Sequence, residues 1–402
     1  MERTVGMAAL IDLNPVLEML VLGAALALVP TALVAWRARR QGVRGWAAWQ
    51  RVLTVATLFL TLDLVVFGAF TRLTDSGLGC PDWPGCYGET SPWGAKTAIA
   101  AEQAVRPHGP VTHHKAWIEM LHRYLATAVG ALITGLMVAA WRRRHAPGAL
   151  SPWWPTLTFV WVCVQGAFGA LTVTSKLQPL IVTLHLLGAL LGVGLLTAQV
   201  RALHPAGSRY ERETTKVWAS SPWRRAGMLV LALLAVQIAL GAWVSSNYAV
   251  LACADFPTCQ GRWWPEMDAA TGFTLWRPLG ENGQGGWIAL PALTAIHMAH
   301  RLMAVVVLLA LLVYGWGLRR HTVWRREGRV LLGLGAWQLL TGLSNVVLNW
   351  PLVAALAHTL GAALLVWWLV RLLVLPGWAR PAGAMVRASK GLHATNRLQR
   401  AP

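Results

Sequence analysis

Nine long runs of apolar residues limit what this chain can fold into. A helix rises 1.5 Å per residue, so about 20 residues cross a hydrocarbon core of roughly 30 Å. Only 13% of the residues are charged, about half the share typical of a soluble domain, and 56% are hydrophobic. We therefore predict an all-α integral membrane protein rather than a water-soluble one. The predicted spans are 16–36, 52–72, 117–140, 154–174, 180–200, 226–247, 293–316, 330–348 and 351–374.

Basic residues gather in alternate loops, which predicts the orientation of the chain. The segment after the first run holds five arginines between Arg37 and Arg51, so the positive-inside rule places it in the cytoplasm. The long loops 73–116 and 248–292 then lie outside, and they contain four of the five cysteines. We predict a bacterial inner membrane protein with periplasmic cysteine loops and a basic cytoplasmic tail. This topology accounts for the net charge of +19 without nucleic-acid binding.

The sequence contains an internal repeat at a shift of 173 residues. Gly68 aligns with Gly241, and His185 with His358. His122 aligns with His300 at a shift of 178, because the second outer loop is five residues longer. Both repeats start on the same side of the membrane, so we predict two pseudosymmetric four-helix bundles in a parallel repeat, plus one extra N-terminal transmembrane helix. The predicted divisions are 1–51 (extra helix and basic loop), 52–205 (N-terminal bundle), 206–225 (cytoplasmic linker), 226–376 (C-terminal bundle) and 377–402 (basic tail).

Histidines inside the predicted spans are the first candidates for a functional site, since ionisable groups in a membrane are costly. His122 with His185, and His300 with His358, lie at similar predicted depths, one pair in each repeat. Two such imidazoles on the second and fourth helices of a bundle can hold a haem between them. Hydrogen bonding between helices is the alternative for any one histidine. Zinc fits less well, because a closed tetrahedral ligand set is missing.

Arginines directly follow two of these histidines. Arg123 and Arg301 could each pair with a haem propionate. An equally weighted alternative is that they extend towards lipid headgroups.

The two repeats differ one turn before the first histidine of each pair. Glu119 stands where the second repeat has His297, and a spacing of three puts Glu119 on the helix face of His122. This carboxylate could relay protons during an oxidation, or could interact with the helix start. We predict chemistry in the first repeat and cofactor binding in the second. Asp63, a buried carboxylate near mid-membrane, serves a proton path or a structural hydrogen bond.

The outer loops carry two cysteine pairs with five residues between the partners. Cys80 with Cys86, and Cys253 with Cys259, could form disulfides in an oxidising compartment. Thiol exchange and a four-cysteine zinc site are less favoured alternatives. Cys163, inside a span, is interpreted as a small apolar residue.

Three segments together resemble the haem A synthase family, whose members oxidise haem O to haem A for cytochrome oxidase. They are GAFTRLTDSGLGCPDWPGC at 68–86, EMLHR at 119–123 and HMAHR at 297–301, and the resemblance covers about 52–375. It implies that successive hydroxylations convert one haem methyl group to a formyl group.

The resemblance also implies roles for individual residues. Haem b as cofactor is expected on His300 and His358, and the substrate haem O on His122 and His185. Glu119 is expected to be important for activity, and disulfides are expected at Cys80–Cys86 and Cys253–Cys259. Haem O synthase and an electron donor are candidate partners. The added helix at 16–36 departs from the family pattern, and it could pack on the core or recruit a partner enzyme. The oligomeric state stays open.

Two other classes of protein compete with this interpretation. The first is an electron-transfer cytochrome with two bis-histidine haems b, against which the difference between Glu119 and His297 argues. The second is a haem transport or assembly protein, for which no soluble docking domain is found.

Overall fold

The computed structural model describes residues 14–204 and 209–376, and the predicted basic tail 377–402 lies outside these ranges. Within them the chain forms helices and isolated β-bridges but no strand, and nine helices are long and apolar enough to cross a membrane. This confirms the predicted all-α membrane fold. The nine are α1 (Asn14–Arg40), α2 (Trp46–Leu73), α4 (His113–Arg142), α5 (Trp153–Thr174), α6 (Pro179–Ala202), α8 (Pro222–Ser246), α10 (Leu290–Arg320), α11 (Arg325–Val347) and α12 (Leu352–Leu373).

Capping side chains determine the residues at which α4 and α6 begin. The Thr112 side chain accepts a hydrogen bond from the N–H of Lys115, so α4 starts at His113 rather than at 117. The Gln178 side chain caps α6 in the same way at the N–H of Ile181, 2.9 Å away, and Pro179 occupies the first turn. Hydropathy alone marks the lipid-crossing part of a helix, whereas these caps mark where hydrogen bonding starts.

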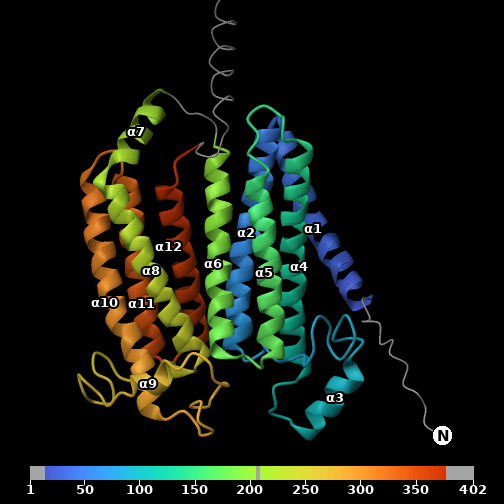
Figure 1. Ribbon diagram of the computed structural model, residues 1–402, viewed down its shortest axis with the longest axis vertical. Coiled ribbons are helices and arrows are strands. Elements are labelled where there is room, and N and C mark those ends of the chain that lie inside the picture. Colours follow the sequence, from blue (N-terminus) through green and yellow to red (C-terminus); the bar gives the residue numbers. More distant parts are fainter. Residues whose placement is uncertain (1–13, 205–208, 377–402) are drawn as a thin grey trace, which may run out of the picture.

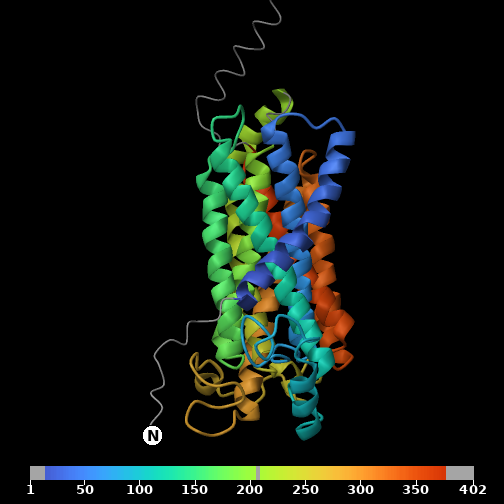
Figure 2. The ribbon, with the colours of Figure 1, turned by 90° about the vertical axis from the view of Figure 1, so that its right-hand side faces the viewer.

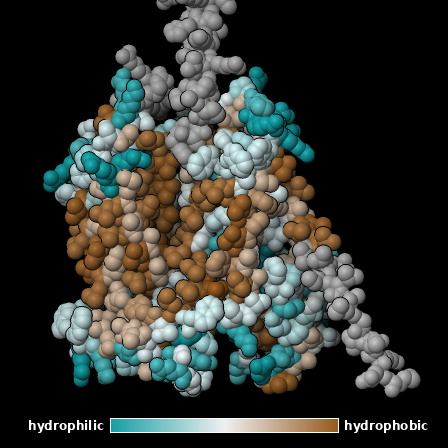
Figure 3. Space-filling model, viewed as in Figure 1, coloured by the Kyte–Doolittle hydropathy of each residue, from teal (hydrophilic) through white to brown (hydrophobic). Residues whose placement is uncertain are grey.

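The helices form two groups that lie side by side (Figure 1). One contains α2, α4, α5 and α6, and the other contains α8, α10, α11 and α12. An apolar cluster fills the boundary between them, with residues from both groups. Its buried members are Leu58, Leu62, Val65, Leu190, Val193, Leu196 and Ala363. On the face seen in Figure 3, apolar residues cover most of the middle of the helices, between two hydrophilic ends.

Three hydrogen bonds join residues that are equivalent in the two repeats. The Arg72 guanidinium donates to the carbonyl of Ser245, and the Tyr248 hydroxyl donates to Asp75, both at 2.5 Å. At the other membrane face, Arg201 donates to the carbonyl of Val374 at 3.2 Å. The sequence separation is 173 in each case, which is the shift of the repeat. Contacts between equivalent positions occur next to a symmetry axis, so the pseudo-twofold axis runs between the bundles along the membrane normal.

The extra helix α1 runs obliquely across the N-terminal bundle (Figure 2). It contacts α4 most, and Gly23 lies so close to Thr127 that a Cβ at Gly23 would collide with it. Near its start, Met19 joins a buried cluster with Met120 and Tyr124. Packing on the core, one of the two roles considered for this helix, is therefore observed.

Short helices outside the spans were not predicted. The outer loops contain α3 (Lys96–Val105), α9 (Ala269–Gly272) and a 3-10 helix at Ala249–Ala252. The segment interpreted as a linker contains α7 (Arg209–Ser220), whose Trp218 donates to the carbonyl of Leu372 at 2.9 Å. The buried Trp218 ring attaches this helix to the end of the C-terminal bundle opposite the cysteine loops.

Candidate functional site

Each of the four paired histidines lies against a glycine on a neighbouring helix. A Cβ at Gly68 of α2 would stand 3.0 Å from Cε1 of His122, and one at Gly241 of α8 would stand 2.9 Å from Cε1 of His300. For His185 and His358 the partners are Gly169 of α5, at 3.7 Å, and Gly342 of α11, at 3.2 Å. The absence of a side chain at these glycines leaves room for the imidazoles.

The same glycines show that the imidazoles lie at one depth. Each is five residues before the last residue of its helix: 73 − 68, 174 − 169, 246 − 241 and 347 − 342. Five residues of α-helix span about 7.5 Å, so all four rings lie roughly that far inside the outer helix ends. The depth cannot be counted along the histidines' own helices, because α4 and α10 start earlier than the apolar runs do.

The histidines of each pair also face each other closely enough to interact. His122 and His185 lie close enough that a positive charge on one ring would repel a charge on the other, and so do His300 and His358. All four residues are only half-buried although they lie inside bundles of apolar helices. Partly exposed rings at equal depth on two helices are what a flat macrocycle between them requires.

The two pairs differ in their hydrogen bonds. In the C-terminal bundle the Gln237 amide nitrogen lies 3.1 Å from Nδ1 of His300, and the Thr341 hydroxyl lies 3.0 Å from Nδ1 of His358. In the N-terminal bundle Nδ1 of both His122 and His185 is buried without a hydrogen-bond partner among the described residues. Sequence reasoning missed Gln237 and Thr341. The signal was present in the repeat alignment, where the residues 173 positions earlier are Leu64 and Phe168.

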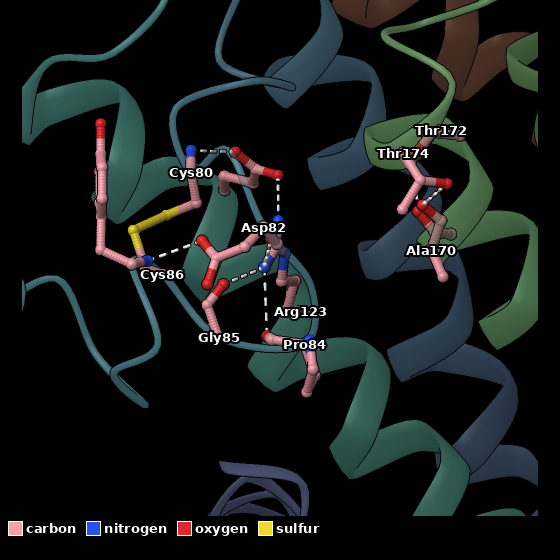
Figure 4. A network of polar contacts seen from close by, with 12 residues as sticks. Cys80, Asp82, Pro84, Gly85, Cys86, Arg123, Ala170, Thr172 and Thr174 are labelled. Carbon is pink, nitrogen blue, oxygen red and sulfur yellow. Dashed lines mark hydrogen bonds and ion pairs between the residues drawn. A yellow bond between two sulfur atoms is a disulfide. The ribbon is translucent and has the colours of Figure 1, made fainter. Parts of the chain in front are cut away.

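Glu119 and Arg123 bind the first cysteine loop. One Glu119 oxygen accepts the backbone N–H of Cys80 at 2.8 Å, and the other pairs with Arg123 at 2.5 Å. The Arg123 guanidinium also donates to the carbonyls of Asp82, Pro84 and Gly85, which lie around it in Figure 4. Both side chains are more than nine-tenths buried. Binding of a propionate by Arg123 stays a prediction, because the contacts seen are to the loop.

The second cysteine loop repeats this arrangement with a neutral partner. Arg301 donates to the carbonyls of Thr258, Cys253 and Asp255 at 2.9–3.0 Å. Its Nε lies 3.3 Å from Nε2 of His297, the residue that replaces Glu119. The arginine after the histidine therefore holds the loop in both halves, and a charged carboxylate supports it only in the first.

An aspartate closes each loop at equivalent positions. Asp82 accepts the N–H groups of Tyr87 and Gly88, and Asp255 accepts those of Gln260 and Gly261. The Thr258 hydroxyl bonds to Asp255 as well and, together with these N–H groups, lowers the pKa of that carboxyl to about 2.

Each loop also contains a disulfide in the structure. Cys80 is bonded to Cys86, and Cys253 to Cys259, with Cα–Cα distances of 4.9 and 4.7 Å. Cys163 is a free, exposed cysteine on α5. In the described ranges no group of three or more His, Cys, Asp or Glu side chains is arranged to hold a metal ion by itself. A haem iron needs only two protein ligands, because the porphyrin supplies four.

The interpretation of Asp63 as a buried carboxylate was wrong. The residue is exposed on α2, and no hydrogen bond or ion pair to it occurs in the part of the chain that the structure describes. It lies one turn from Phe67, whose ring stacks on that of His122 with centroids 6.2 Å apart. The apolar surroundings in the sequence suggested burial, but this side of α2 has no neighbouring helix that covers Asp63.

Comparison with known proteins gives a consistent result. The model of the COX15-CtaA family, described as cytochrome oxidase assembly protein, matches residues 51–370. A heme A synthase of Shewanella oneidensis is 36% identical over 78% of this chain and 92% of its own length. Heme A synthases of Rhizorhabdus wittichii and Caulobacter vibrioides are each 28% identical, over 76% and 75% of this chain and 88% and 87% of their own lengths.

The matched segment begins in the second turn of α2, the first helix of the N-terminal bundle, and includes all four paired histidines and both cysteine loops. Helix α1 lies outside it. With this match and nine apolar helices within residues 14–204 and 209–376, the protein is a multi-pass membrane protein. The chain therefore belongs to the COX15-CtaA family of cytochrome oxidase assembly proteins.

Proposed function

We propose that this chain is a membrane oxidoreductase that converts haem O to haem A for cytochrome oxidase. The observation that carries the proposal is the presence of two imidazole pairs at one depth, one in each half of a chain of this family. Relatives that match over about nine-tenths of their length are named for the same activity. An electron-transfer cytochrome with two haems b is not favoured by these relatives.

The residues present fit haem in both bundles. Each bundle offers two half-buried imidazoles on neighbouring transmembrane helices, and among the described residues no third His, Cys, Asp or Glu side chain joins them in a metal-holding group. In our proposal His300 and His358 of the bundle at 226–376 hold haem b, and His122 and His185 of the bundle at 52–205 hold the substrate. Haem b supplies one-electron redox chemistry when bound.

Glu119 is the candidate acid–base group of the first bundle. It lies one turn from His122, is buried, and has no carboxylate counterpart in the second bundle, where His297 stands. Its ion pair with Arg123 and its bond to Cys80 also give it a positioning role for the loop. We propose that it exchanges a proton during oxidation of the haem methyl group to a formyl group.

The sidedness and partners follow from the charge pattern and the family. We propose that the cysteine loops face the periplasm and that the arginine-rich ends of the spans face the cytoplasm of a bacterial cell. Haem O synthase and an electron donor are the proposed partners. Because α1 lies outside the family match and presents an apolar outer surface, it is the candidate site for recruiting one of them.

Pigment analysis of purified variants tests the proposal. We expect His300→Ala and His358→Ala to lose the haem b spectrum. We expect His122→Ala, His185→Ala and Glu119→Ala to keep that spectrum and to stop haem A formation in cells supplied with haem O. Retention of haem b in both C-terminal histidine variants would contradict the ligand assignment. Two stable haems b without conversion of haem O would favour the electron carrier.

A further inference from the structure

The imidazoles of the two bundles differ in what binds their second ring nitrogen. We propose that Gln237 and Thr341 are positioning residues that make the C-terminal bundle retain its haem. Their apolar counterparts, Leu64 and Phe168, leave the ligands of the N-terminal bundle unsupported, so that its haem can exchange. This inference rests on the proposed function, in which one haem is a resident cofactor and the other is a substrate.

Thr341 fixes the tautomer of His358. The Thr341 hydroxyl donates its proton to the carbonyl of Trp337 at 2.7 Å, so towards Nδ1 of His358, 3.0 Å away, it acts as an acceptor. Nδ1 therefore carries the ring proton, and Nε2 keeps the free lone pair that an iron ligand needs. Gln338 holds the same residue through the carbonyl of His358 at 2.9 Å, so both ring and backbone are oriented.

Gln237 plays the equivalent part for His300. Its amide nitrogen lies 3.1 Å from Nδ1 and 3.3 Å from the His300 carbonyl, while its oxygen is buried without a partner among the described residues. The two ends of an amide exchange places by a half-turn. After that turn the oxygen accepts the Nδ1 proton in exchange for the bond to the His300 carbonyl, and the amide, which also lies 3.4 Å from Nε2, moves off Nε2 when iron binds there.

The N-terminal bundle has neither acceptor. Positions 64 and 168, equivalent to 237 and 341, hold a leucine and a phenylalanine, whose side chains cannot accept a hydrogen bond. Consistently, Nδ1 of His122 and of His185 is buried and unpaired in the part of the chain that is described. The Phe67 ring, stacked on His122, supplies only an apolar contact.

This difference affects how tightly iron is held. A hydrogen bond from the second ring nitrogen orients the imidazole and makes it a stronger base, and removal of such a partner typically weakens metal binding about 10- to 100-fold. A resident cofactor benefits from this support. A substrate haem that must leave after oxidation is better served by ligands without it.

The first experiment removes the acceptors from the C-terminal bundle. Purified Thr341→Val and Gln237→Leu variants should lose haem b about 10- to 100-fold faster to an excess of apomyoglobin than the unchanged protein does. The midpoint potential of the remaining haem b should rise, because a weaker base stabilises ferric iron less. Thr341→Ser, which keeps the hydroxyl, should restore both values.

The reciprocal experiment adds an acceptor to the N-terminal bundle. Phe168→Thr should slow the release of haem bound there, measured as haem transfer from protein loaded with haem O. Unchanged haem release and unchanged potentials in Thr341→Val and Gln237→Leu would overturn the inference. This holds even where the loss of haem b from His300→Ala and His358→Ala supports the proposed function. If those two alanine variants keep haem b, the proposed function fails first.

Discussion

Gly241 leaves the imidazole of His300 just enough space beside α8. A Cβ there would stand 2.9 Å from Cε1, closer than real Cβ contacts, whereas the nearest atom to a Cβ at Gly335 of α11 is 3.9 Å away. Gly241→Ala should therefore displace the ring, at a cost of about 1–3 kcal/mol, and reduce bound haem b. Gly335→Ala, in the same bundle, should bind haem normally.

Haem content per protein, determined from the pyridine haemochrome spectrum, checks this prediction. Melting temperatures of both variants in detergent show whether the fold survives. Equal haem content in the two variants would mean that the glycine does not position the ligand.

Asp255 should make the second cysteine loop sensitive to acid. Its pKa in the folded protein is about 2, below the ordinary value of about 3.9 for an unfolded chain. A carboxyl with a lowered pKa contributes stability that is fully present above pH ~4 and is lost as the pH falls through about 2.

Amide hydrogen exchange between pH 2 and 5 measures this loss directly. Protection of the N–H groups of Gln260 and Gly261, which Asp255 accepts, should fall with the pH in the unchanged protein. The Asp255→Asn variant, which has no charge to lose, should show little further change over the same range. If protection falls with pH equally in both proteins, Asp255 is not the group whose protonation loosens the loop.

At the scale of elements, the first cysteine loop is attached to α4 and the equivalent second loop to α10 by different electrostatics. The Glu119–Arg123 pair is buried, so Arg123→Ala leaves a carboxylate without its cation, which typically costs about 3–5 kcal/mol. Arg301→Ala leaves a neutral His297 and removes only hydrogen bonds, so it should destabilise less.

A double-mutant cycle separates the two contributions. Thermal unfolding should be measured for Glu119→Ala, Arg123→Ala and the double variant. The double variant should lose much less stability than the sum of the stability losses of the two single variants. Additive losses would show that the pair does not act as a unit.

At the scale of the whole molecule, two of the three contacts between equivalent positions join the bundles at the end that carries the cysteine loops. Arg72→Ala removes the bond to the Ser245 carbonyl, and it also removes the guanidinium that lies 4.0 Å from the centre of the Tyr248 ring. A hydrogen bond from a charged group contributes about 1.5–3 kcal/mol. We expect faster hydrogen exchange at residues 245–252 and a lower melting temperature.

Tyr248→Phe is the matched variant, because it removes only the hydroxyl bond to Asp75, whose side chain is 55% exposed. It should have a smaller effect than Arg72→Ala, since water replaces an exposed partner readily. If Tyr248→Phe has an equal or larger effect than Arg72→Ala, the bond from Arg72 to Ser245 is not the main contact between the bundles at this end.

The sidedness of the molecule can be tested with its own cysteines. The four loop cysteines are paired, so a membrane-impermeant maleimide added to intact spheroplasts should label them only after reduction. Cys163→Ala removes the background from the free cysteine on α5. Labelling in inverted vesicles but not in spheroplasts would reverse the proposed topology.

Much of this architecture could be predicted from local patterns in the sequence. Each span is about 20 apolar residues long because lipid leaves backbone groups no partner but their own helix, so hydropathy alone located all nine. The shift of 173 revealed the repeat, because a duplicated chain keeps its spacing. The matched histidine pairs followed from the same alignment.

Only the tertiary structure decided how side chains from different helices meet. Glu119 and Arg123 bind a loop some 40 residues away in the chain, and Thr341 supports His358 from another helix. Asp63 is exposed because no helix covers that side of α2. Hydropathy and periodicity describe one helix at a time, whereas these contacts depend on how helices are rotated and packed against one another, which no local pattern encodes.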